Sequence, residues 1–197
     1  MGMAQQRIPL WVKVAYTLMV LIIIPVYWYT LGVTNFLWFS DIALILMVPA
    51  LWWENRLLAS TMAVGVLLLE LHWVADFISG ANLTQVALYM FTDQEPWYIK
   101  LLSGIFHFAL PPVIILMLLK YGYDKRAYPL QILIALMVIP FTYLVTGPDK
   151  NINWVYGFAE QQTNLAPHIY LALLLAGAIL LVYTPSHFIL KRLFQTH

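Results

Sequence analysis

Hydrophobic positions gather in six long runs along the chain, and the polar positions lie between these runs. A bilayer core of roughly 30 Å needs about 20 apolar residues in a helix, and a helix satisfies its own backbone hydrogen bonds in lipid. The runs do not alternate in polarity, as the strands of a membrane barrel would. The pattern predicts an all-α fold, a single domain over residues 1–197, in which a six-transmembrane-helix bundle forms from helices near 10–31, 35–53, 57–78, 98–121, 130–146 and 168–190.

Lysine and arginine fall mainly in one set of connections, and cytoplasmic loops are the ones that retain positive charge. If the N-terminus lies inside, only Lys100 and Lys150 lie outside. We therefore expect both termini on the cytoplasmic side and the two long connections, near 79–97 and 147–167, on the outer side. The residues expected inside are Arg7, Lys13, Arg56, Lys120, Lys125, Arg126, Lys191 and Arg192.

Composition changes the picture in two ways. Hydrophobic residues make up 62% of the chain and charged residues only 10%, whereas a soluble domain carries roughly 25% charged residues. The lipid bilayer is therefore the expected partner of most of the surface, and a net charge of +1 without a basic cluster argues against a nucleic-acid partner. The absence of cysteine excludes disulfides, thiolate metal sites and cysteine nucleophiles, so that His, Asp or Glu must hold any metal.

Several polar and ionisable residues lie inside the predicted helices, where each one costs at least a few kcal/mol unless it has a partner or a function. In the inferred topology they all fall in the outer half of the membrane. They are Ser40, Asp41, Glu70, His72, Asp76, Ser103, His107 and His168.

The third predicted helix carries the densest group of these residues. Thr61, Gly65, His72 and Asp76 are separated by 4, 7 and 4 positions, which predicts one stripe that faces the bundle interior. His72 and Asp76 would then be neighbours, and an Asp that binds one imidazole nitrogen leaves the other free for a metal or a proton. Glu70 lies about 160° around the helix from His72, so we expect it to face a different neighbour.

Three interpretations of these residues remain open. The first is a divalent metal site, for zinc or iron, that activates water near the outer face. The second is a proton or ion pathway, and the third is a network of interhelical hydrogen bonds without any ligand. In the first interpretation the metal ligands are His72, His107 and His168, and the catalytic residues are Ser40, Asp41 and Asp76.

The corresponding functions also differ in class. The leading hypothesis is a membrane enzyme that acts on a lipid or small apolar substrate from the outer face. One alternative is a small-solute or proton-coupled transporter or channel, in which Glu70, Asp76 and His107 titrate along a path. Another is a structural or assembly subunit of a membrane complex. The chain has no HExxH, P-loop, GxGxxG or GxSxG motif, so the sequence alone does not decide whether it is an enzyme.

Three segments carry a resemblance to known proteins. NFLWFSDIAL (35–44), YGYDKRA (121–127) and KNINWVYG (150–157) resemble a group of small bacterial multi-pass inner-membrane proteins. The resemblance implies a bacterial inner membrane and brings no established activity.

A second similarity is to the alkaline-ceramidase-like membrane hydrolases, which combine a Ser, an Asp and three His around zinc. The last predicted helix departs from that family, because the HxxxH pair is missing and His168 and His187 are nineteen residues apart. The residues that match the inventory are Ser40, Asp41, His72, Asp76, His107 and His168.

Overall fold

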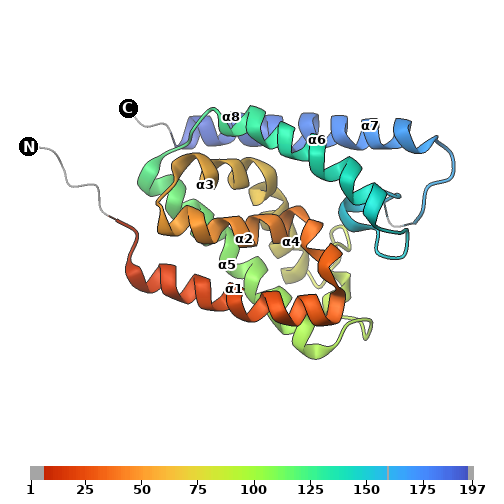
Figure 1. The fold of residues 1–197 in the computed structure, drawn as a ribbon, viewed down its shortest axis with the longest axis horizontal. Coiled ribbons are helices and arrows are strands. Elements are labelled where there is room, and N and C mark those ends of the chain that lie inside the picture. Colours follow the sequence, from red (N-terminus) through yellow and green to blue (C-terminus); the bar gives the residue numbers. More distant parts are fainter. Residues whose placement is uncertain (1–6, 159, 195–197) are drawn as a thin grey trace, which may run out of the picture.

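The protein is all-α in the computed structural model, which describes residues 7–158 and 160–194. Over these residues the helices form six rods that run back and forth along one another (Figure 1). Five rods are long and apolar enough to cross a membrane, and the remaining one is shorter. The chain is therefore a multi-pass membrane protein, as its hydrophobic pattern predicts.

The rods agree with the predicted helices to within three residues at every boundary except one. Two of them are interrupted by a short π-helical segment, written η2 and η5. In chain order the rods are α1 (Leu10–Leu31); α2 (Phe39–Trp52); α3 (Arg56–Met62), η2 (Ala63–Leu67) and α4 (Leu68–Ile78); α5 (Trp97–Tyr121); α6 (Ala127–Val145); and α7 (Pro167–Gly177), η5 (Ala178–Tyr183) and α8 (Thr184–Leu193). Three 3-10 turns lie between them: η1 (Val33–Leu37), η3 (Leu88–Met90) and η4 (Ile152–Trp154).

The exception is the start of the second rod. The sequence predicts a helix from residue 35, but α2 begins at Phe39, because the chain turns at Gly32 (φ 85°) and then forms η1. The 14 residues of α2 cover about 21 Å at 1.5 Å per residue, which is less than the roughly 30 Å of a bilayer core. The later start places Asp41 in the first turn of α2.

The two π segments have local causes. A π turn holds an extra residue compared with an α turn. In the last rod, η5 directly precedes Pro185, which has no N–H and so breaks the regular hydrogen-bond ladder. In the third rod, the end of the Gln131 side chain lies 2.7 Å from the point that a Cβ of Gly65 would occupy, so a larger residue there would have to displace Gln131. The segments η2 and η5 pack against each other, so two irregular turns meet inside the bundle.

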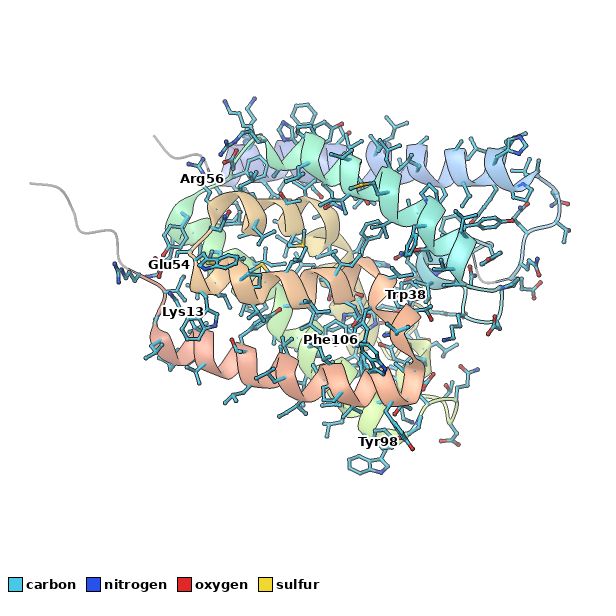
Figure 2. The ribbon with its side chains drawn as sticks, in the orientation of Figure 1. Lys13, Trp38, Glu54, Arg56, Tyr98 and Phe106 are labelled. Carbon is cyan, nitrogen blue, oxygen red and sulfur yellow. The ribbon has the colours of Figure 1, made fainter. Side chains whose placement is uncertain are left out.

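One end of the bundle, here named the basic end, holds Lys13, Glu54 and Arg56, which are labelled in Figure 2. Asp124, whose amide donates to Ser60, and Arg126, which pairs with Asp124, belong to the same end. The Lys13 Nζ atom lies 2.7 Å from Glu54 Oε1, and Arg56 donates to the carbonyl of Tyr123. The amide of Tyr123 donates to the carbonyl of Phe194 at 2.9 Å.

These contacts bring the beginning of α1 and the end of α8 to the same end of the bundle, as expected for six rods that run back and forth. The extreme termini, which we expect in the cytoplasm, lie outside the described residues.

Candidate functional site

A buried polar cluster lies between α2, α4 and α5, towards the end opposite the basic end. Its members, here named the acid–imidazole cluster, are Asp41, Glu70, Ser103 and His107, and each is at most 8% exposed. They come from three different rods, and the loop between α4 and α5 closes over them through Tyr89. The structure therefore gathers ionisable groups from distant parts of the sequence in the apolar interior.

Glu70 and His107 form a direct pair. The Nδ1 atom of His107 lies 2.6 Å from Glu70 Oε2. Because an ionised carboxylate only accepts hydrogen bonds, the pairing places a proton on Nδ1. The Nε2 atom then has no hydrogen-bond partner within residues 7–158 and 160–194, so it is the nitrogen that can take up a further proton.

Aromatic rings hold the imidazole in place. The ring of Trp73 stacks on His107 with a centroid distance of 4.0 Å and an interplanar angle of 15°. The ring of Phe106, labelled in Figure 2, lies 3.9 Å from the imidazole and packs edge-on against Tyr27 of α1. The two rings therefore fix the orientation of the imidazole between α4 and α5.

Asp41 is the third charged member of the cluster and is only 3% exposed. Its Oδ2 atom accepts a hydrogen bond from Asn35 Nδ2 at 3.2 Å, whereas Oδ1 is buried without a partner in the described part of the chain. The charge of Glu70 also acts on Asp41.

Over the same residues, no Lys or Arg side chain pairs with either carboxylate. Two carboxylates and one imidazole without a basic partner must retain a proton or bind a cation, because an uncompensated charge is expensive in a bilayer.

The loop from Ser79 to Pro96 is fastened to the bundle at two points. At the first, the hydroxyls of Tyr89 and Ser103 lie 2.6 Å apart, so this loop directly touches the acid–imidazole cluster. The second point is Asp76, whose carboxylate is fully buried and accepts three backbone hydrogen bonds, from Leu83 (3.0 Å), Thr84 (2.9 Å) and Ala87 (2.9 Å). Both oxygens of Asp76 are thus occupied by the loop.

The predicted pairing of His72 with Asp76 is wrong. His72 is exposed, and its Nε2 atom lies 2.8 Å from the hydroxyl of Thr84. Both residues lie in α4, and they do not pair because backbone amides of the loop occupy both oxygens of Asp76. The π segment η2 has a different effect: its extra residue rotates every later position of the rod by about 100° relative to a regular α-helix. The interior stripe that passes Gly65 therefore continues through Glu70 and Trp73, both of which are buried.

The remaining predicted site residues lie apart from the cluster. Ser40 is half-buried in the first turn of α2 and makes no hydrogen bond with the other candidate residues in the described ranges. His168 is exposed in the first turn of α7, which packs mainly against α6. Across residues 7–158 and 160–194, no three His, Asp or Glu side chains are placed to hold a metal ion. His72, His107 and His168 are therefore not assembled around one position.

An apolar groove runs along the lipid-facing surface beside the cluster. It has a volume of about 560 Å³ and lies between α1 and α5, with Val26 and Leu102 in its wall. These two residues directly precede Tyr27 and Ser103, which face inward. The apolar wall of the groove suits contact with the acyl chain of a lipid. That the protein acts on a lipid or a small apolar substrate remains a prediction. The rest of the lining is Pro25, Tyr29, Thr30, Trp97, Tyr98 and Leu101.

Helix-phase reasoning misses the Glu70–His107 pair, although both residues stand out as ionisable groups in apolar runs. A regular α-helix through Gly65 turns His72 inward and Glu70 away, and nothing local in the sequence shows that a distant Gln131 lies against Gly65.

No protein-family model, curated protein or solved structure matches the chain. Function is therefore inferred from the side chains and their surroundings.

Proposed function

We propose that this membrane protein moves protons across the bilayer, alone or coupled to a small solute, with the acid–imidazole cluster as its protonation site. One observation carries the proposal: Asp41, Glu70 and His107 lie together in the apolar interior, and no Lys or Arg of the described residues pairs with them. Ionisable groups inside membrane helices mark proton and ion paths, because their cost in lipid must be offset by a function.

The chemistry of the three groups suits reversible protonation. A histidine has two ring nitrogens, so one can be held while the other exchanges a proton. Glu70 holds Nδ1 of His107, which leaves Nε2 for that exchange. The unpartnered Oδ1 atom of Asp41 supplies a second acceptor. A proton held at one of these positions lowers the repulsion between the two carboxylates.

The helix that carries His107 also has a weak point at that residue. Pro111 and Pro112 lie inside α5. A proline removes the hydrogen bond to the carbonyl four residues earlier, so Pro111 releases the carbonyl of His107 itself. Kinks in membrane helices arise at such positions. The proposed protonation site thus lies where α5 bends most easily, which suits a site that must face two sides in turn.

The orientation we propose has both termini in the cytoplasm of a bacterial inner membrane. Support comes from the basic end, which gathers the start of α1, the end of α8 and two connections, and carries Lys13, Arg56 and Arg126. Positive charge of this kind stays on the cytoplasmic side. The acid–imidazole cluster would then lie in the outer half of the membrane, beneath the loop that Asp76 anchors.

The enzyme and assembly-subunit hypotheses stay predictions. A hydrolase would need a nucleophile within reach of a base. The Ser103 hydroxyl is hydrogen-bonded to the hydroxyl of Tyr89. In the described chain, Ser40 makes no hydrogen bond with His107 or with Asp76. The observed contacts therefore favour proton movement over acyl transfer.

The test is proton flux into proteoliposomes that contain a pH-sensitive dye and are driven by a potassium diffusion potential. Wild-type protein should take up protons faster than protein-free vesicles. The variants Glu70→Gln and His107→Gln should lose most of this flux, because they remove the carboxylate and the imidazole of the pair. The matched control is His72→Gln, which changes an exposed histidine on the same rod as Glu70 and should keep the wild-type rate. Wild-type flux equal to that of empty vesicles, or unchanged flux in Glu70→Gln, would refute the proposal.

A further inference from the structure

A second set of buried polar atoms lies between the acid–imidazole cluster and the basic end. Gln131 of α6 and Ser186 of α8 are each 1% exposed. The Nε2 atom of Gln131 and the hydroxyl of Ser186 have no hydrogen-bond partner anywhere in the described ranges. The Nε atom of Arg56, at the basic end, is buried and unpartnered in the same way.

Gln131 and Ser186 face the two π segments. The side chain of Gln131 lies against Gly65 of η2, 2.7 Å from the position of a Cβ there, and it interacts with the hydroxyl of Tyr183 at the end of η5. Ser186 follows Tyr183 by three residues, so the two side chains share a helix face. The helix α8 packs on η2, and α6 packs on both η2 and η5. The unpartnered atoms of Gln131 and Ser186 therefore belong to the region where α6, α8, η2 and η5 pack together, here named the π junction.

A polar molecule bound at the π junction would stabilise the buried polar atoms that lack a hydrogen-bond partner. A buried donor or acceptor without a partner costs about 1–3 kcal/mol. Each π segment adds to the demand, because a π turn takes backbone groups out of the regular α ladder. No Asp, Glu, His, Lys or Arg belongs to the junction as defined by Gly65, Gln131, Tyr183 and Ser186, so the occupant need not carry charge. Water, which donates and accepts and makes about three hydrogen bonds when buried, fits this set of groups.

We propose that the π junction is a hydrated pocket, with water as its ligand, and that it forms the inner half of a proton path below the acid–imidazole cluster. Gly65 precedes Glu70 by five residues, which corresponds to about 7.5 Å along the rod. Ser60 precedes Gly65 by the same interval, and its hydroxyl accepts a hydrogen bond from the amide of Asp124 at 3.0 Å, at the basic end. Polar groups thus continue from Glu70 to the basic end. The role as a path depends on the proposed function, whereas the hydration does not.

The chain contains no cysteine, so single-cysteine variants allow a direct test of hydration. Ser186→Cys and Gln131→Cys place a thiol at the π junction. The matched control, Ala135→Cys, lies one turn further along α6 and is also fully buried, but in the apolar core. Folded protein in nanodiscs is treated with a small water-soluble methanethiosulfonate reagent, and modification is followed by intact mass. Both junction variants should react at least about tenfold faster than Ala135→Cys, which must wait for local unfolding.

Equal, slow modification of all three variants would overturn the hydrated pocket. Monodisperse elution of each variant shows that it is folded, and the second junction variant guards against a defect specific to one substitution. Flux measurements separate this result from the test of the proposed function. Fast modification with a flux that does not depend on Glu70 would support the pocket and refute its role in a proton path. Slow modification with Glu70-dependent flux would refute the pocket and its place in the path, and would leave the proposed function supported.

Discussion

The Asp76 carboxylate should be the main anchor of the loop that covers the acid–imidazole cluster, and replacing it should release this loop. It accepts hydrogen bonds from the amides of Leu83 and Thr84 on one oxygen and from the amide of Ala87 on the other. Asp76 and Ala87 are both fully buried, whereas Leu83 and Thr84 are exposed. Water can therefore replace the carboxylate at Leu83 and Thr84 but not at Ala87.

The expected cost follows from these differences. In Asp76→Asn the retained oxygen can still bind Leu83 and Thr84, but the new amide group cannot accept from Ala87. The lost bond leaves one buried donor unpaired and costs about 1–3 kcal/mol. In Asp76→Ala the two other bonds are lost as well, each worth about 0.5–1.5 kcal/mol after hydration, so that the total is about 2–6 kcal/mol. A loss of about 2 kcal/mol corresponds to roughly 30-fold faster opening of the loop.

Hydrogen exchange measured by mass spectrometry on protein in nanodiscs checks this prediction. Peptides that cover residues 79–91 should exchange faster in Asp76→Asn and faster still in Asp76→Ala, while peptides from α5 and α6 keep their protection. Asp93→Asn is the matched control, because it makes the same chemical change at an exposed position of the same loop. Wild-type protection of residues 79–91 in Asp76→Ala would refute the anchoring role and with it the assignment of these hydrogen bonds.

Three other predictions concern the rest of the molecule. Gly65→Ala should destabilise the protein by about 1–3 kcal/mol through overpacking against Gln131, and adding Gln131→Ala should recover part of the loss in unfolding measurements. At the basic end, burial raises the pKa of Glu54, but hydrogen bonding by Lys13 outweighs burial and holds this pKa below its ordinary value. This stabilisation is complete above about pH 4.3 and is lost as the pH falls through the lower folded-state pKa. Thermal unfolding between about pH 6 and pH 3 should therefore show a steeper decline for wild-type protein than for Glu54→Gln. Reporter tags on the two termini should both appear on the cytoplasmic side, and tags on opposite sides would contradict the proposed orientation.

The sequence by itself determines the rods. A run such as residues 98–121 has one low-energy form in lipid, because only a helix satisfies the backbone where water is absent, and α5 occupies nearly the same range. The sequence also indicates that Lys and Arg gather at one end, because six rods that alternate in direction bring the basic segments together. His107 also stands out without the structure, since an ionisable group in an apolar run requires a partner.

Only the tertiary structure decides which side chains meet. The partner of His107 is Glu70, not His72, because η2 adds one residue to a turn and rotates the rest of the rod. This turn packs against Gln131, from a helix more than sixty residues away. Asp76 likewise turns to the amides of a loop whose path the sequence does not reveal. Local hydrophobic free energy selects helices within each segment, whereas packing between segments sets their rotation, and a rotation of one residue is enough to exchange the groups that face the interior.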